Sequence, residues 1–518
     1  MRPEAALSPR TQPQTRNELP RLHKNISASW LGLGTEVIVG VLLTPFVLHR
    51  IGATQFGIWV VVTAFTGYYG LLDLGTRNAI TRFVARHNAH DDVAALNETV
   101  STAFAAYLIV GTIALVVTTA AALMAGRIFR IEAPLVPTAV QVIVVVGIGT
   151  ALGFPLSIFG GVLEGLQRFT TVGVAQAVMI VCRGLVIVGA VQRGGSVVAV
   201  AIITTGGNVL AGALHAYFAY RACPELRIRL SGARRRRVRE LADFGLVTFW
   251  IGIANRLRFQ SDALVIGALI ALSQVTAFAV AARLVTYATE IVATMASVFT
   301  PIFTDLHARN ATDDLIRVLQ RGNLYSSFLA VPIAAGIVLL GRDVIRLWVG
   351  PAYEASATLM IIIGIPMCAY VAQSASTRVL YGVARHQFLA KVLLCEGIAN
   401  LVLSCALAPR LGLLGVALGT AMPLLVTSCL VIPIHVSRTL GIPIHEYCAS
   451  FVAPVLAGIP LIVFWTLTAG VRDAVSAAPA LLLTTVGGGL VYVGGFALLV
   501  KSAPILLART RVQQRVSG

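Results

Sequence analysis

The chain has 518 residues, of which 57% are hydrophobic and only 12% are charged, and its mean hydropathy is +0.84. A soluble chain of this length carries charge on roughly a quarter of its residues, so the composition excludes a soluble protein and favours one dissolved in lipid. The formal charge of +18 comes mostly from Lys and Arg that flank apolar runs. That distribution is typical of a membrane protein and argues against nucleic-acid binding.

In chain order, the first feature is a polar, proline-containing segment, 1–25, that lacks the apolar core of a signal peptide. We expect it to be a disordered cytoplasmic tail. A membrane-spanning helix needs about 20 mostly apolar residues. The stretches that satisfy this are 26–48, 55–73, 98–126, 135–161, 170–191, 196–220, 242–269, 274–301, 324–341, 355–380, 388–408, 412–436, 447–470 and 479–500. The sequence therefore predicts an all-α polytopic membrane protein with about 14 transmembrane helices.

The order of these spans predicts the domain organisation. Spans in 26–220 form an N-terminal six-helix lobe, a basic cytoplasmic linker covers 221–241, and 242–437 forms a C-terminal six-helix lobe. An extra transmembrane pair, 447–500, and a basic cytoplasmic tail, 501–518, follow. Because Lys and Arg concentrate in alternate loops, the positive-inside rule places both termini in the cytoplasm.

The two lobes carry similar sequences in one region. Residues 82–87 lead to Asp91 and Asp92 and then to a new span, and residues 302–307 lead to Asp313 and Asp314 and then to a new span. Internal repeats of this kind are how many transporters build alternating access. The pattern predicts two lobes related by an internal repeat.

The sequence lacks the common enzyme and metal-site motifs. It contains no HExxH, Walker A, GxSxG elbow or EF-hand pattern, and its seven cysteines are scattered without a CxxC. We therefore expect no catalytic activity, no cofactor and no metal site.

Ionisable residues inside the spans are the informative ones, because such a side chain at bilayer depth costs several kcal/mol unless it meets a partner or a cavity. The arginines of this kind are Arg183, Arg256, Arg258, Arg283 and Arg378. The acids are fewer: Glu36, Asp262 and Glu290, with Glu396 at the margin.

Spacing suggests how these charges are arranged. Arg258 and Asp262 are four residues apart, so they share a helix face and can pair, while Arg256 and Gln260 form a second stripe. One interpretation is ion pairs that fix helix packing. The other is a positively charged cavity for an anionic substrate, because a guanidinium stays charged and binds phosphate through two parallel hydrogen bonds.

On the second interpretation the charged residues divide into two roles. The substrate-binding candidates are Arg183, Arg256, Arg258, Gln260, Arg283 and Arg378. The candidates for coupling to a proton or Na⁺ are Glu36, Asp262 and Glu290.

From about residue 24 to 440 the chain resembles a known family. The segments that carry the resemblance are 52–59 (GATQFGIW), 71–75 (LLDLG), 80–85 (ITRFVA), 165–169 (GLQRF), 262–267 (DALVIG), 347–353 (LWVGPAY), 381–385 (YGVAR) and 411–417 (LGLLGVA). In order and spacing they resemble the polysaccharide transporter family, the Wzx-like oligosaccharide flippases of the multidrug/oligosaccharidyl-lipid/polysaccharide exporter superfamily.

The resemblance implies two six-helix lobes around a V-shaped cavity. It implies a flippase in the bacterial inner membrane that moves undecaprenyl-diphosphate-linked glycan from the cytoplasmic to the outer leaflet. It also implies membrane lipids, a polysaccharide polymerase and glycosyltransferases as partners. A multidrug or cation antiporter of the same superfamily is the alternative, but the excess of arginine over acid disfavours it. A membrane glycosyltransferase is less favoured, because the outer loops are short.

Overall fold

The structure is a computed structural model that describes residues 19–73, 76–230, 249–383, 385–470 and 477–502. Among these residues there are only helices, turns and loops, with no strand. The predicted all-α polytopic class is confirmed. Most of the predicted N-terminal tail, much of the basic linker and nearly all of the C-terminal tail lie outside the described residues, and the first helix begins at Leu19, inside the predicted tail.

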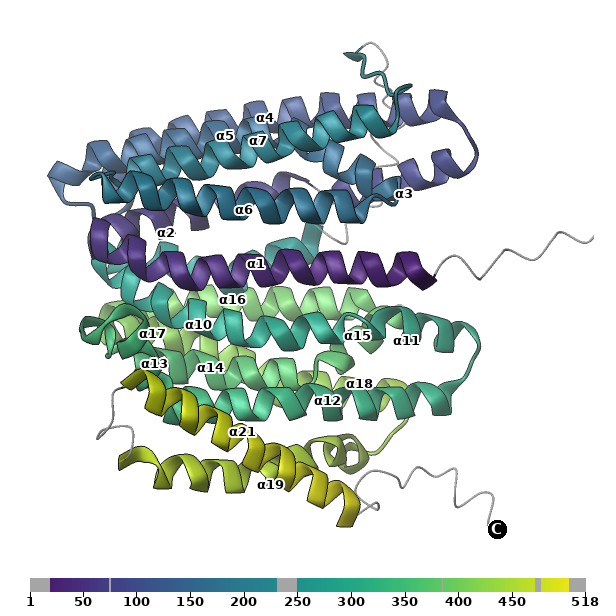
Figure 1. The fold of residues 1–518 in the computed structure, drawn as a ribbon, viewed down its shortest axis with the longest axis vertical. Coiled ribbons are helices and arrows are strands. Elements are labelled where there is room, and N and C mark those ends of the chain that lie inside the picture. Colours follow the sequence, from purple (N-terminus) through teal and green to yellow (C-terminus); the bar gives the residue numbers. More distant parts are fainter. Residues whose placement is uncertain (1–18, 74–75, 231–248, 384, 471–476, 503–518) are drawn as a thin grey trace, which may run out of the picture.

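The first half of the chain forms the upper bundle of long, roughly parallel helices in Figure 1, coloured purple to teal. It contains α1 (Leu19–Ile51), α2 (Ala53–Gly67), the 3₁₀ helix η2 (Tyr68–Asp73), α3 (Thr76–Ala89), α4 (Val93–Ile128), the 3₁₀ turn η3 (Ala133–Leu135), α5 (Val136–Gly165), α6 (Phe169–Gln192) and α7 (Val197–Ala222).

The second half forms the layer below it in Figure 1, with the last two helices outermost. Residues 249–259 are helical. They are followed by α9 (Ser261–Leu269), α10 (Leu272–Ala296), α11 (Phe299–Ala308), α12 (Thr312–Leu339), α13 (Gly341–Val349), η5 (Pro351–Tyr353), α14 (Ser356–Ala372), α15 (Ser374–Gly382), α16 (His386–Leu411), α17 (Leu413–Val426), the π-helix η6 (Thr427–Val431), α18 (Ile432–Leu440), α19 (Ile444–Leu467) and α21 (Ala477–Ser502).

Twelve helical segments of the described chain are long and apolar enough to cross a membrane, and the bent pair α14–α15 makes thirteen. The predicted span 242–269 is described only from residue 249 and is interrupted at Gln260. The count of about 14 therefore stays a prediction.

The outer faces of these helices are apolar. Large side chains such as Leu123, Leu467 and Leu483 are mostly exposed, at 81%, 79% and 72%. In lipid, a helix satisfies its own backbone hydrogen bonds, so apolar side chains can face outward along its whole length. The protein is a multi-pass membrane protein.

The two halves share a helical hairpin. Between α3 and α4, Asp91 has a φ of 52°, and between α11 and α12, Asn310 has a φ of 55°. In both turns a backbone N–H reaches back five residues, from Asp92 to the carbonyl of His87 and from Ala311 to that of Leu306, each at 3.0 Å. These are the segments in which the sequence of the two halves is alike.

The halves contact each other closely where α1 ends and α2 begins, which we call the closed end. There the Thr276 hydroxyl donates to the Ala53 carbonyl at 2.6 Å. A Cβ on Gly57 would lie 2.0 Å from the backbone oxygen of Leu272, so only glycine allows this approach.

A second contact at the closed end depends on a proline. The Trp348 indole N–H of α13 donates to the Val41 carbonyl of α1 at 2.7 Å. Pro45 lies inside α1 and has no N–H to offer the carbonyl four residues before it, which is that of Val41. The second half therefore satisfies a backbone group that the first half leaves free.

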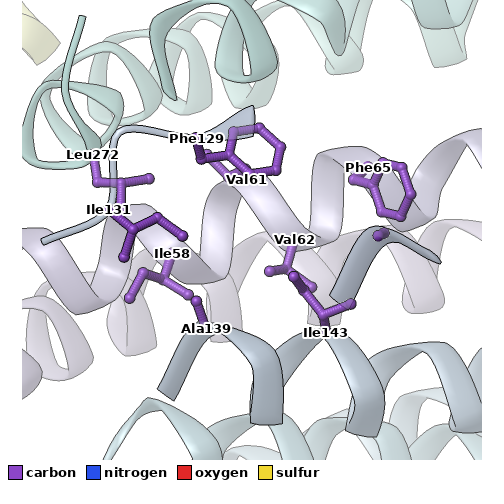
Figure 2. A pocket seen from close by; sticks show the side chains of 10 residues that line it. Ile58, Val61, Val62, Phe65, Phe129, Ile131, Ala139, Ile143 and Leu272 are labelled. Carbon is purple, nitrogen blue, oxygen red and sulfur yellow. The ribbon is translucent and has the colours of Figure 1, made fainter. Parts of the chain in front are cut away.

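The closed end also contains an apolar pocket, shown in Figure 2. Its lining comes from α2, the α4–α5 region and the start of α10, and it is entirely apolar: Ile58, Val61, Val62, Phe65, Ala121, Phe129, Ile131, Ala139, Ile143 and Leu272. Leu272 belongs to the second half, so both halves build this wall.

The extra pair α19 and α21 is tied into the second half by a buried polar network. The Tyr447 hydroxyl of α19 donates to Gln373 Oε1 and shares a hydrogen bond with Ser376 Oγ, both at 2.8 Å. Gln373 stands at the 47° bend between α14 and α15, and its amide donates to the Ser428 carbonyl in the π-helix at 2.5 Å. The network therefore joins α19 to the bend between α14 and α15 and to the π-helix.

Candidate functional site

Arg256 lies where the second half faces the end of α2. The Tyr68 hydroxyl donates to the Arg256 carbonyl at 3.2 Å. An added Cβ on Gly67 would lie 3.0 Å from Arg256 Nη1, and one on Gly70 would lie 2.9 Å from Nη2, so the guanidinium rests against this glycine-lined surface. Among the described residues no acid pairs with it.

Gln260 shares that surface. Its Oε1 would lie 2.3 Å from a Cβ on Gly67, and this oxygen is buried without a hydrogen-bond partner in the described part of the chain. Arg256 and Gln260, predicted to form one stripe, are thus brought to the same wall.

Arg258 has the opposite environment, although it is only two residues away. Its Nε contacts Glu396 Oε1 at 2.5 Å, and the two side chains are only 2% and 4% exposed. Its guanidinium also lies 4.7 Å and 4.8 Å from the ring centres of Phe259 and Tyr370. Arg258 is therefore enclosed within the second half.

The expected pairing of Arg258 with Asp262 is wrong. A one-residue turn at Gln260 separates the helix that carries Arg258 from α9, which begins at Ser261 and carries Asp262, and Arg258 is paired with Glu396. Asp262 Oδ2 instead accepts a hydrogen bond from the Thr420 hydroxyl of α17 at 2.9 Å.

The surroundings of Asp262 are rich in oxygen. The Thr420 hydroxyl also reaches Asn400 Oδ1 at 3.3 Å and the Val416 carbonyl at 3.3 Å. Asp262 is 5% exposed, and its Oδ1 has no hydrogen-bond partner among the described residues. A carboxylate with hydroxyl, amide and carbonyl oxygens nearby suits a proton or a hard monovalent cation.

The Asn400 side chain links Asp262 to Arg258. Its amide donates to the Arg258 carbonyl at 2.9 Å, while its Oδ1 accepts from Ser404 at 2.9 Å. Glu396, Asn400 and Ser404 follow one another at four-residue intervals in α16. This polar stripe in an apolar helix was the sequence signal that could have identified the partners of Arg258 and Asp262.

Arg283 lies on α10, where that helix meets α1. Its Nε donates to the Tyr287 hydroxyl at 3.0 Å, and that hydroxyl would lie 2.1 Å from a Cβ on Gly40 of α1. Arg283 and Glu290 are both exposed. Arg283 is thus at the seam between the halves but is not placed with Arg256 by any contact.

The remaining candidates are Arg183, Glu36 and Arg378, which no contact between described residues joins to Arg256. Arg183 of α6 donates to Asn208 Oδ1 of α7 at 2.8 Å, within the first half, and Glu36 is exposed on α1 and within electrostatic range of it. Arg378 of α15 is near Tyr381, as is Arg258. The five arginines therefore lie in different environments. Fewer of them than the sequence suggested lie between the halves without an acid partner.

Known proteins resemble this chain over most of its length. The membrane protein EpsK of Bacillus subtilis is 23% identical over 480 residues, which cover 90% of this chain and 93% of that protein. The probable flippase AglR of Haloferax volcanii is 22% identical over 491 residues, covering 93% and 96%.

A solved structure has the same fold. The lipid II flippase MurJ, in an inward closed conformation, superposes with a TM-score of 0.71 at 11% identity, covering 93% of this chain and 99% of that one. At such low identity the likeness concerns the fold alone.

The family profile described as "polysaccharide biosynthesis protein" matches residues 22–307, more than half of the chain. The chain therefore belongs to this family.

Proposed function

We propose that the protein flips a polyprenyl-diphosphate-linked oligosaccharide from the inner to the outer leaflet of the bacterial inner membrane, for surface polysaccharide biosynthesis. The observation that carries this proposal is Arg256, a cation between the two halves without an acid partner among the described residues. A guanidinium in that position is free to hold a diphosphate, whereas the lipid chain stays in the bilayer.

The proposed orientation in the membrane determines which leaflet the closed end faces. With the N-terminus in the cytoplasm, α1 runs outward from Leu19 and the closed end faces the outer leaflet. In that orientation the contacts of the closed end separate the substrate from the outer side of the membrane. We also place the C-terminus in the cytoplasm. The glycosyltransferases that supply the lipid-linked glycan would act on that side of the membrane, and the polymerase that consumes it would act on the other side.

The role of Arg256 is tested by export of surface glycan in cells that express the variants at wild-type levels. Arg256→Ala removes the charge and should lower export about tenfold or more, because a hydrogen-bonded charge contributes about 1.5–3 kcal/mol. Arg256→Lys keeps the charge but not the paired donors and should be intermediate.

The matched control is Arg309→Ala, which removes an exposed arginine in an exposed pair with Asp305. If Arg256→Ala exports as well as this control, the proposed site is wrong. Arg258 is unsuitable for this test, because its loss also breaks a buried ion pair.

We further propose Asp262 as the residue that couples transport to a proton or Na⁺. Its buried carboxylate and the oxygens of Thr420, Asn400 and Val416 support this choice over Glu36 and Glu290, which are exposed. In proteoliposomes, Asp262→Asn should abolish the response of transport to an imposed pH or Na⁺ gradient. Glu36→Gln and Glu290→Gln should keep it, and a retained response in Asp262→Asn would refute the assignment.

A multidrug or cation antiporter is the alternative within the same superfamily. It needs an acid in the position that Arg256 occupies, since organic cations bind negative groups. Expression in an efflux-deficient host distinguishes the two: resistance to cationic drugs that survives Arg256→Ala would favour the antiporter.

A further inference from the structure

Two glycines at the end of α2 form the surface on which Arg256 rests. Gly67 is the last residue of α2 and Gly70 lies in the 3₁₀ helix that continues it. We call this pair the glycine seat. Any side chain there would occupy the space of the guanidinium, since the added Cβ atoms would lie 3.0 Å and 2.9 Å from its two terminal nitrogens.

These glycines differ from those that serve helix packing. At Gly57 an added Cβ meets the backbone oxygen of Leu272 at 2.0 Å, so that glycine allows two backbones to approach. At Gly67 the nearest atoms are the ends of two flexible side chains, Gln260 and Arg256. The glycine seat therefore makes room for functional groups and not for a backbone.

The electrostatics of the seat suit a cation. An amide oxygen carries a partial negative charge and only accepts hydrogen bonds. The guanidinium of Arg256 lies beside Gly67, as does the buried, unpartnered Gln260 Oε1. Partial charges, unlike the carboxylate beside Arg258, stabilise a cation without neutralising it.

The backbone of Arg256 is held to the same place. The Tyr68 hydroxyl, which stands between the two glycines in the sequence, donates to the Arg256 carbonyl at 3.2 Å. The first half therefore positions both the backbone and the side chain of a residue that belongs to the second half.

We propose that Gly67 and Gly70 are positioning residues that hold the Arg256 guanidinium, still charged and uncompensated, where the two halves bind the diphosphate of the substrate. This inference rests on the proposed function. It adds that the binding group of one half is correctly placed only when it is seated on the other half.

The test is the affinity of the purified full-length protein in detergent for farnesyl diphosphate, a short polyprenyl diphosphate. Gly67→Ala and Gly70→Ala should each weaken binding about three- to tenfold by displacing the guanidinium. Arg256→Ala should weaken it about tenfold or more. Gly153→Ala is the matched control, because an added Cβ at Gly153 meets nothing within 4 Å.

A double-mutant cycle separates positioning from general damage. In the Arg256→Ala background, Gly67→Ala should cause no further loss, since the seat then has nothing to position. An equal loss in both backgrounds would overturn the inference.

Two further outcomes are distinct. If Arg256→Ala weakens binding but the seat variants behave like Gly153→Ala, the seat is refuted and the proposed function stands. If Arg256→Ala leaves binding unchanged, both fall. The thermal unfolding temperature of each variant should match that of Gly153→Ala, because Gly67→Ala and Gly70→Ala contact only flexible side-chain ends.

Discussion

Arg256 and Arg258 show how differently two neighbouring arginines can be used. Arg258 is neutralised by Glu396 and enclosed by Phe259 and Tyr370, whereas Arg256 faces glycines of the other half. Burying a charge requires a partner, and removing one partner leaves the other charge uncompensated. Arg258 therefore stabilises the fold, whereas Arg256 has no acid partner among the described residues, which is why we propose it as the residue that binds the ligand.

The role of Arg258 in the fold predicts a strong effect on stability. Arg258→Ala or Glu396→Gln should each lower the free energy of unfolding by about 3–5 kcal/mol, because a buried pair is broken. Thermal or denaturant unfolding in detergent measures this. Replacing both residues together with apolar ones of similar size should recover much of the loss.

Arg309→Ala is again the comparison, since its pair with Asp305 is 72% and 56% exposed. An exposed pair contributes about 1 kcal/mol or less. Equal destabilisation by Arg258→Ala and Arg309→Ala would contradict the buried-pair interpretation.

At the level of single residues the sequence identified the charges inside the spans but not their partners. Its excess of arginine was evident, yet the partner of Arg258 lies 138 residues away in α16. Four-residue spacing suggested Asp262 instead, because nothing in the sequence showed that the helix is interrupted at Gln260. The importance of Gly67 and Gly70 depends on what the other half presents to them, which only the packing reveals.

Helical elements in the second half are broken where polar residues interrupt apolar runs. Gln260 separates residues 249–259 from α9, and Gln373 separates α14 from α15. Both runs read as continuous spans in the sequence, because hydropathy averaged over about 20 residues hides a single polar residue. Gln373 is held by Tyr447 of α19, so the extra pair supports the bend.

Replacing a tyrosine by phenylalanine should affect the stability of the protein differently in α19 and in α21. Tyr447→Phe leaves Gln373 Oε1 without its buried donor and should destabilise the protein by about 1–3 kcal/mol. Tyr492→Phe should be neutral or stabilising, because the Tyr492 hydroxyl is buried with no partner among the described residues.

Differential scanning calorimetry or thermal unfolding in detergent compares these two variants directly. A stability loss in Tyr492→Phe as large as that in Tyr447→Phe would show that the network around Gln373 contributes nothing special. A loss confined to Tyr447→Phe would show that α19 is part of the second half and not an appendage to it.

For the whole molecule, the apolar runs were sufficient to predict the all-α polytopic class. Their hydropathy reflects the bilayer, which acts on every span alike. The contacts between the halves were not predictable. Thr276 with Ala53, and Trp348 with Val41, join segments more than 200 residues apart through backbone carbonyls, which carry no sequence signal.

The closed end should depend on Gly57. In Gly57→Ala the new Cβ would lie 2.0 Å from the Leu272 oxygen, a backbone atom that cannot turn aside. Overpacking of this kind costs about 1–3 kcal/mol, so the halves should separate there more often, by about tenfold. Faster amide hydrogen exchange in 53–58 and 272–277 would measure it.

Gly153→Ala is the control for this variant, because its Cβ enters open space. If both variants exchange at the same rate in 53–58, close backbone approach is not what closes this end. The effect should be confined to these two segments, since the buried pair and the Tyr447 network lie elsewhere.

The pocket at the closed end has a consequence for the membrane that contains it. Its ten lining side chains are hydrocarbon, so a water molecule there would find no hydrogen-bond partner. Such cavities stay dry, and a dry segment interrupts any chain of waters along which protons could pass. A transporter that opens to one side of a membrane with a proton gradient must not let protons pass to the other side. If the protein transports its substrate as we propose, the apolar wall in Figure 2 blocks the passage of protons as well as of the substrate.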